Sequence, residues 1–406
     1  MRGGCGPGRR TELDRFTRLN HPPEVLLSAD NQPVVAPIHQ SVKFEFATVA
    51  ATVENWRGER PGFNYSRSSN PTTRQLELTL AQLQGRDDAL VCASGVGAIA
   101  NALLALTKQG DHVLAFVDLY GPTRHLLRRV LGKFGVTHTL LSITDLPGVE
   151  RVLAATPTRL VVFESPTNPM NKIADIAALT GLARRFGALT LMDNTLAGVH
   201  QHGQYDVDVF VHSLTKFAAG HGDVMAGAVI ARSDLIGAMR TDFNVFGGTL
   251  DPHAAFLVQR GLKTYAVRFR EECANAQQVA EFLAAHPAVA RVHYPGLPAH
   301  PGHKLARAQM GAFGSVVTFD LRAGGEAGRR FAEALQLFAM AASLGATDSL
   351  VLPPQLLGSR DLTGEQQAMA GIGPGTVRLS IGLESIQDLL ADLGQALILA
   401  GASIES

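Results

Sequence analysis

The chain has 406 residues, of which 46% are hydrophobic and 18% are charged, and its 36 Lys and Arg residues balance its 36 Asp and Glu residues. This length predicts two or three domains, and the charge balance argues against nucleic acid or a polybasic membrane surface as the main partner. Three widely spaced cysteines predict no disulfide framework. Because we find no signal peptide and no membrane span, we expect a cytoplasmic protein.

The first 62 residues lack sustained periodicity and contain several prolines, which predicts an irregular N-terminal arm with a disordered tip at residues 1–10. From Asn70 the pattern changes, and Pro71 leads into Thr73–Gln84, where leucines form the apolar face of a helix.

Between residues 63 and 257, short apolar runs alternate with helical segments. Strands this apolar are buried on both faces, so we expect a large α/β domain with a mainly parallel sheet covered by helices. The strands are predicted at His112–Val117, Leu160–Phe163, Leu189–Met192, Val207–Val211 and Val224–Ile230, and the helices at Gly97–Leu106, Thr123–Phe134 and Ile176–Phe186.

After residue 257 the pattern predicts a smaller C-terminal α+β domain, residues 258–406. A Pro- and His-rich stretch, residues 286–301, separates its first helix from the rest. Its helices are predicted at Glu271–Ala285, Gly325–Phe338 and Ser385–Ala400, and its strands at Gly314–Leu321 and Val377–Ile381.

Polar side chains follow two apolar runs in the large domain. Asp193 ends one predicted strand, and Ser213, Thr215 and Lys216 end the next. Ligands of open α/β sheets bind beyond the carboxyl ends of the strands, so we expect these groups in one crevice. These groups suit pyridoxal 5′-phosphate (PLP). The amine can bond to its aldehyde, the carboxylate can keep its pyridine nitrogen protonated, and the hydroxyls can bind its phosphate. A lone Lys216 would be read as a solvated loop residue, but the surrounding groups favour the cofactor.

Three further segments fit the same crevice. The small residues of Cys92–Ala98 precede an apolar helix, so backbone N–H groups there can approach a phosphate, although a plain tight turn is the alternative. Tyr120 follows a strand and can stack on the pyridine ring, or be a surface turn residue. Asn168 can bond to the phenolic oxygen of the cofactor, or simply form an Asn-Pro turn.

Two histidine pairs have spacings that a metal could use, His200 with His202 and His300 with His303. They lie in predicted loops without a supporting set of carboxylates. We therefore predict no metal site.

The segments His212–Lys216 (HSLTK) and Asn64–Thr72 (NYSRSSNPT) resemble the lysine motif and the YSR-x-x-NPT signature of the cystathionine γ-synthase family of Cys/Met-metabolism PLP enzymes. The similarity runs from about Pro33 to the C-terminus. It implies the PLP-dependent transferase fold type I and a homotetramer built from two tight dimers. It also implies that Tyr65 and Arg67 bind the PLP phosphate in the active site of the neighbouring subunit.

The same resemblance implies the remaining cofactor contacts. Gly95 and Val96 would offer backbone N–H groups to the phosphate, and Ser213 and Thr215 would complete the cradle. The cofactor residues are then Tyr65, Arg67, Ser94, Gly95, Val96, Tyr120, Asn168, Asp193, Ser213, Thr215 and Lys216, of which Lys216, Tyr120 and Asp193 are expected to be catalytic.

Near the C-terminus the resemblance implies substrate contacts. Arg378 would bind the α-carboxylate of the substrate, with Ser343 assisting. Asp348 stands where cystathionine-acting members often carry glutamate, and Pro122 where methionine γ-lyases carry cysteine. Gly358–Ser359 replaces a common Thr-His pair. These departures leave the identity of the γ-substituent open.

The sequence therefore predicts γ-elimination or γ-replacement on a sulfur-containing or homoserine-derived L-amino acid, with a thiol as co-substrate if replacement occurs. Lys216 would move protons, first from Cα and then from Cβ. One alternative is β-elimination on cystathionine or cysteine. Another is a catalytically silent PLP-binding regulatory module, which the joint presence of Lys216, Asp193, Tyr120 and Arg378 disfavours. A nucleotide-binding dehydrogenase is disfavoured because no Gly-rich loop follows the first strand.

Overall fold

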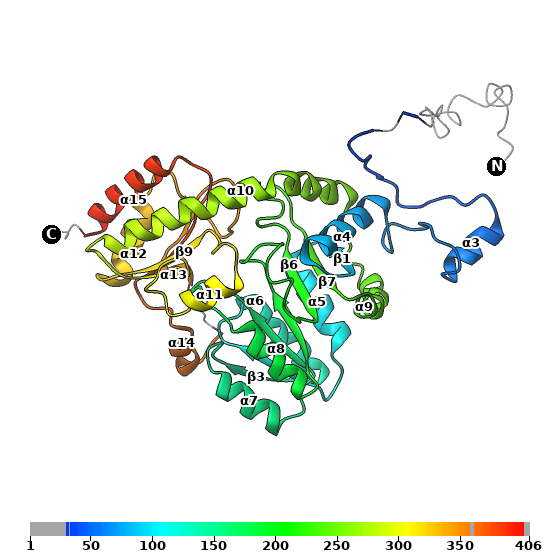
Figure 1. Ribbon diagram of the computed structural model, residues 1–406, viewed down its shortest axis with the longest axis horizontal. Helices are drawn as coiled ribbons and strands as arrows, with labels where there is room; N and C mark the ends of the chain where they lie inside the picture. The colour runs from blue at the N-terminus through cyan, green and yellow to red at the C-terminus, as the bar shows by residue number, and fades with distance from the viewer. Residues whose placement is uncertain (1–29, 32, 358–360, 402–406) are drawn as a thin grey trace.

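The computed structural model describes residues 30–31, 33–357 and 361–401. Two sheets organise these residues, and one long helix links them (Figure 1). The predicted disordered tip at residues 1–10 lies outside the described residues, as does Gly358–Ser359. No helix in the described ranges is long and apolar enough to cross a membrane.

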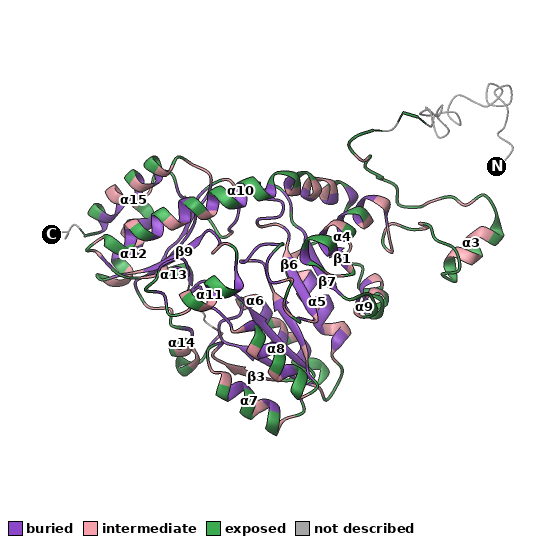
Figure 2. Ribbon diagram, in the orientation of Figure 1, coloured by how far each residue is buried: buried purple, intermediate pink, exposed green. Residues whose placement is uncertain are grey.

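The first sheet has seven strands in the order β1-β7-β6-β5-β4-β2-β3. It is mainly parallel, as predicted, with β7 antiparallel to both of its neighbours. Every residue of β2, β4 and β7 is buried, which explains why their sequences are apolar throughout rather than alternating (Figure 2). The strands are β1 Asp88–Cys92, β2 His112–Phe116, β3 Thr137–Leu141, β4 Leu160–Glu164, β5 Leu189–Asp193, β6 Val209–Ser213 and β7 Gly227–Ala231.

Helices pack against this sheet, with α4 and α5 against β1 and β7 and α8 against β5. Several begin at a side chain that accepts a hydrogen bond from a first-turn N–H group, as Ser94 does for α5. The helices of this part are α3 Val49–Trp56, α4 Pro71–Gln84, α5 Gly95–Leu106, α6 Gly121–His125, η1 Leu126–Val130, η2 Leu131–Phe134, α7 Leu146–Ala155, α8 Ile176–Arg185 and α9 Ser233–Phe246.

The second sheet is smaller and mixed, with the order β10-β11-β12-β9-β8 and its own apolar core. Together the two sheets confirm the predicted fold class, an α/β protein with a smaller C-terminal sheet. The elements are β8 Val289–His293, α11 His303–Gln309, β9 Val316–Leu321, α12 Gly324–Ala334, β10 Ala339–Met340, β11 Leu350–Leu352, α13 Pro354–Leu357, α14 Gly364–Ala370, β12 Thr376–Ser380 and α15 Ile386–Gly401.

The linking helix, α10 (Pro252–Ala285), is much longer than the predicted Glu271–Ala285. The Asp251 side chain caps it by accepting from two first-turn N–H groups, and Pro252 begins its first turn. Its buried residues belong to both cores. The helix crosses the predicted domain boundary between residues 257 and 258, and the boundaries at 62/63 and 257/258 remain predictions.

Other differences follow from weak local patterns. The predicted helix Thr123–Phe134 consists of α6, a π-helical turn η1 and a 3₁₀ turn η2, and it ends at Gly135 in the left-handed conformation. The elements that were not predicted are strands β1, β3, β8, β10 and β11 and helices α3, α7, α9, α11, α13 and α14. β3 has no fully buried residue, and α3, inside the arm predicted to be irregular, buries none within the chain.

The start of α5 touches the start of β7. A Cβ added at Gly227 would lie 2.1 Å from the Ser94 carbonyl oxygen. We expect Gly227→Ala to push the helix start away and destabilise the protein by about 1–3 kcal/mol, visible as a lower thermal unfolding midpoint. Gly237→Ala in α9, where a Cβ meets open space, is the matched control and should leave the midpoint unchanged or higher. Equal midpoints for both variants would contradict the contact.

Candidate functional site

A cavity of about 1060 Å³ lies at the carboxyl ends of β4, β5 and β6. Both sheets contribute to it, since Asp193 and Lys216 come from the first and Arg378 from the second. Most of the predicted site residues meet here: Ser94, Gly95, Val96, Tyr120, Asn168, Asp193, Ser213, Thr215, Lys216, Ser343 and Arg378.

Three predicted residues lie outside this cavity in the single chain. Tyr65 is 44% exposed and pairs with Lys43 in an isolated bridge. The Arg67 guanidinium lies 5.2 Å from the centre of the Tyr65 ring. Asp348 is exposed, and its carboxylate accepts a hydrogen bond from the Thr347 hydroxyl. The cavity of one chain therefore lacks these three side chains.

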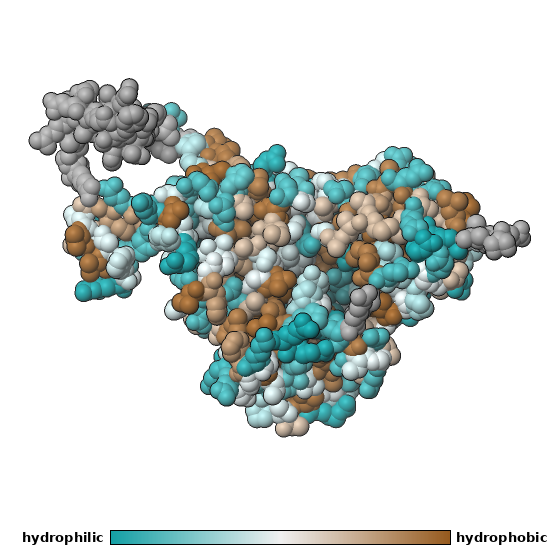
Figure 3. Space-filling model, turned by 180° about the vertical axis from the view of Figure 1, so that it is seen from behind, coloured by the Kyte–Doolittle hydropathy of each residue, from teal (hydrophilic) through white to brown (hydrophobic). Residues whose placement is uncertain are grey.

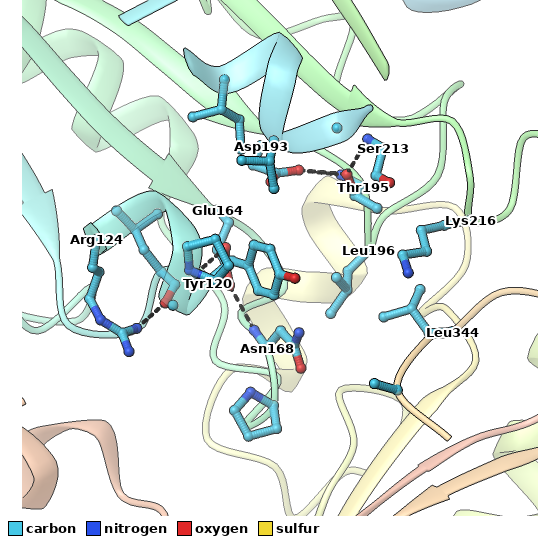
Figure 4. A pocket seen from close by; sticks show the side chains of 18 of the residues that line it. Tyr120, Arg124, Glu164, Asn168, Asp193, Thr195, Leu196, Ser213, Lys216 and Leu344 are labelled. Carbon is cyan, nitrogen blue, oxygen red and sulfur yellow. Dashed lines mark hydrogen bonds between the residues drawn. The ribbon is translucent and has the colours of Figure 1, made fainter. Parts of the chain in front are cut away.

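Lys216 lies on a turn that directly follows β6. Its Nζ donates to Ser343 Oγ at 2.8 Å, and Figure 4 shows the amine pointing into the cavity beside Leu196 and Leu344. Burial, and secondarily the charge of Arg378, lowers the pKa of Lys216. A larger fraction of the amine is therefore uncharged near neutral pH, which is the form that acts as nucleophile or base.

Two carboxylates, the buried Glu164 and the half-buried Asp193, lie side by side at the ends of β4 and β5, because the two residues pair in the strand register. Asp193 Oδ1 accepts from the backbone N–H of Thr195 at 3.0 Å and from its hydroxyl at 2.6 Å (Figure 4). Glu164 accepts from the backbone N–H groups of Tyr120 at 3.0 Å and Asn168 at 2.8 Å. Burial raises the pKa of both carboxyl groups, and the charge of Asp193 adds to the rise for Glu164.

No Lys, Arg or His among the described residues forms an ion pair with Asp193. A buried carboxylate without a cation is costly, so this position suits the protonated ring nitrogen of PLP. Glu164 and Thr195 were not predicted as site residues. The available signal was the Asp193-Asn-Thr195 sequence, in which a hydroxyl two residues after a carboxylate can donate back to it.

The start of α5 forms a second wall of the cavity. The first N–H groups of a helix have no partner within the helix, and the helix dipole attracts anions to them. Here those of Gly95 and Val96 lie beside the hydroxyl residues Ser213 and Thr215. Ser94 already accepts from the N–H of the third helical residue. This wall suits a phosphate.

Arg378 on β12 is buried but not fully hydrogen-bonded. It donates to Asn168 Oδ1 at 3.1 Å and to the Ser343 carbonyl oxygen at 2.8 Å, and its Nε has no partner in the described structure. Burial lowers its pKa to about 10, so the guanidinium stays charged at neutral pH. A buried, charged guanidinium that lines the cavity suits the carboxylate of an amino acid.

The histidine pairs form ordinary hydrogen bonds. His200 and His202 bond to side chains, and His300 and His303 to backbone atoms. The described residues contain no group of three or more His, Cys, Asp or Glu side chains arranged to hold a metal.

One cavity on a mainly parallel sheet thus brings together a lysine amine, a carboxylate that needs a cation, an anion-binding helix start and a buried arginine. These features define a PLP-dependent enzyme of fold type I. The sequence profile of the Cys/Met metabolism PLP-dependent enzyme family matches residues 26–398. The chain belongs to this family. Its chemistry is that of the PLP-dependent carbon–sulfur lyases and γ-replacement enzymes, as predicted.

Individual relatives support the same family assignment. The chain is 44% identical to L-methionine gamma-lyase of Pseudomonas putida over 369 residues, covering 90% of this chain and 92% of that protein. It is 38% identical to cystathionine beta-lyase of Lactococcus lactis subsp. cremoris, covering 90% and 94%. The solved structure of cystathionine gamma synthase from Xanthomonas oryzae pv. oryzae in complex with cystathionine has a TM-score of 0.86 at 36% identity, covering 92% of this chain and 95% of that one.

The raised pKa of Asp193 makes a pH prediction for the cofactor-free protein. A folded-state pKa above the unfolded value means that the folded state binds the proton more tightly, so stability falls as pH rises through that window. We expect Asp193→Asn to raise the unfolding midpoint relative to wild type by about 1–5 °C, with a gain that grows as the pH rises above the ordinary aspartate pKa of 3.8.

The matched control is Asp234→Asn. Asp234 is exposed on α9, and hydrogen bonding to Arg232 lowers the pKa of its carboxyl group. This variant should show no such gain. A gain for Asp193→Asn that is the same at every pH would contradict the assigned carboxylate burial.

Proposed function

We propose that the chain catalyses γ-elimination on a sulfur-containing L-amino acid such as methionine or cystathionine. The observation that carries the proposal is the Lys216 amine, 2.8 Å from Ser343 Oγ, in one cavity with the acid Asp193 and the buried cation Arg378. The 44% identity to an L-methionine gamma-lyase supports γ-chemistry over the alternatives.

Each residue has a distinct part in this proposal. Arg378, held by Asn168, binds the α-carboxylate and orients the substrate. Lys216 takes the proton from Cα and then moves protons at Cβ. When bound, PLP supplies the electron sink for the electrons released at Cα. Asp193 keeps the ring nitrogen protonated, and Tyr120, whose side chain points into the cavity, covers the ring (Figure 4).

The products of elimination are a thiol, a 2-oxo acid and ammonia, with water consumed. If an added thiol instead forms a bond to Cγ, the original thiol leaves, the amino group is kept, no water is consumed, and the same residues perform γ-replacement. The second candidate is β-elimination, which the 38% identity to a cystathionine beta-lyase favours. Pro122 lines the cavity at the position where methionine γ-lyases carry cysteine. It therefore contributes to the choice between γ- and β-elimination.

A substrate panel tests the function. We expect methionine or cystathionine to yield 2-oxobutanoate, measured by chromatography of the keto acids with and without added thiol. Lys216→Ala should lose both turnover and the visible absorbance of the covalently held cofactor, because no other lysine among the described residues lines the cavity. Pyruvate as the sole keto acid from cystathionine would replace γ-elimination by β-elimination. Full activity in Lys216→Ala would overturn the role of the lysine.

Arg378→Ala should raise KM for the amino acid about ten- to hundredfold, since a hydrogen bond to a charged group contributes about 1.5–3 kcal/mol. PLP affinity should change little. The measurement is steady-state kinetics alongside a PLP titration of the cofactor-free protein. Arg307→Ala, at an exposed arginine of α11 outside the cavity, should change neither value. If PLP affinity falls while KM holds, the carboxylate role is wrong.

We also propose a homotetramer of two tight dimers, with each active site completed by the Tyr65 and Arg67 side chains of the neighbouring subunit. Residues 33–62 of the arm project from the body of the chain and expose apolar side chains (Figure 3). Val34 is 101% exposed, Val49 80% and Trp56 74%. Such a surface is unfavourable in water and suits a protein interface. The cytoplasmic location also remains a prediction.

Subunit mixing tests the shared site. Arg67→Ala and Lys216→Ala proteins are each expected to be inactive or nearly so. After subunit exchange, a mixed dimer contains one site with both residues intact, so activity should return to as much as about half of the wild-type value per mixed dimer. Activity that stays at the level of the parents, with exchange confirmed by mass spectrometry of tagged subunits, would show that each site is self-contained.

A further inference from the structure

A buried arginine of the linking helix α10 packs directly behind the turn that carries Lys216. Arg268 is 5% exposed. Its Nη2 donates to the Phe217 carbonyl oxygen at 3.2 Å and to the Gly261 carbonyl oxygen at 2.9 Å, and its Nε donates to Thr264 Oγ1 at 3.2 Å. One guanidinium thus ties the helix to the peptide group next to Lys216.

The contact leaves no free space between the turn and the guanidinium. The turn closes on itself, since the Gly220 N–H donates to the Lys216 carbonyl oxygen at 2.8 Å. Gly220 has φ +70°, and a Cβ there would lie 1.7 Å from Arg268 Nη1. A shift of Arg268 therefore has to shift the turn.

The neighbouring aromatic contacts extend this support to the second sheet. The Phe217 ring packs edge-on against Phe269 of α10, with centroids 5.2 Å apart. On its other side, a Cβ added at Gly345 would lie 2.8 Å from the Phe217 ring. Gly345 lies two residues after Ser343, whose hydroxyl accepts from Lys216 Nζ. The same stretch of helix therefore supports both partners of that hydrogen bond.

Glu272, one helical turn later, lies near Arg268 but does not draw its guanidinium away from the backbone carbonyl oxygens. It is fully buried, and its nearest oxygen lies 3.8 Å from Arg268 Nη1. In the described structure neither Glu272 oxygen nor Arg268 Nη1 has a hydrogen-bond partner. The guanidinium keeps its bonds to the backbone carbonyls because the carboxylate stays beyond hydrogen-bond distance.

We propose that Arg268 is a positioning residue that sets the orientation of Lys216, an inference that rests on the proposed role of Lys216. It touches neither cofactor nor substrate. It fixes the backbone from which the lysine side chain extends, and a misplacement of about 1 Å costs an enzyme about a hundredfold in rate.

The test is the double variant Arg268→Met/Glu272→Gln, which removes both charges together and so leaves no unpaired buried charge. We expect kcat to fall about tenfold or more while KM stays within about twofold. We also expect a slower attachment of PLP to the cofactor-free protein and a shifted pH midpoint of the visible absorbance. The unfolding midpoint is measured in parallel. A variant with wild-type kcat, attachment rate and pH midpoint would overturn the inference.

Two single variants sharpen the result. Glu272→Gln leaves an unpaired buried charge and so should lower the unfolding midpoint. It leaves the bonds of Arg268 to the backbone in place, so it should keep the wild-type pH midpoint of the visible absorbance. Thr264→Val removes one hydrogen-bond acceptor of Arg268. It should shift the pH midpoint of the visible absorbance in the same direction as the double variant, but by less. If the double variant does not fold, the test rests on Thr264→Val. An unchanged pH midpoint of the visible absorbance in that variant rejects the inference. Lys216→Ala separates the two claims, because its full activity would reject the proposed function instead.

Discussion

Two carboxylates held side by side by the register of β4 and β5 are the constraint on which the site depends. Glu164 and Asp193 end neighbouring parallel strands, and loss of contact with water raises the pKa of both carboxyl groups. Backbone N–H groups and the Thr195 hydroxyl donate to them, and the same hydroxyl accepts from the Ser213 N–H at 2.9 Å. The need to stabilise these two acids therefore links β5 to β6, which brings the phosphate wall and the Lys216 turn into fixed positions.

The second sheet supplies Arg378, the cation that we propose for the substrate carboxylate, whereas Arg124 of α6, which also lines the cavity, is already paired with Asp361. Arg378 comes from β12, and its two bonded nitrogens reach Asn168 beyond β4 and the Ser343 backbone. The arginine is therefore oriented by both parts of the chain. The wall proposed for the cofactor, on the first sheet, and the cation proposed for the substrate, on the second, meet across a single cavity.

How much of this was predictable depends on the range of the interactions. The strands that carry Asp193 and Lys216 are continuous apolar runs, so their ends, and the residues that meet there, could be found from local pattern alone. The extent of α10 could not, because its apolar stripe is divided between two cores. Nor could the contacts of Glu164 or Arg268, since each joins segments far apart in the chain whose spacing carries no signal.

The length of α10 affects how the protein unfolds. Its 34 residues make a rod of about 50 Å. Val258 and Phe269 on this rod belong to the core of the first sheet, while Val279 and Leu283 belong to that of the second. Loss of either core removes the packing that keeps the rod helical for the other. The two sheets are therefore expected to melt as one cooperative unit rather than as separable bodies.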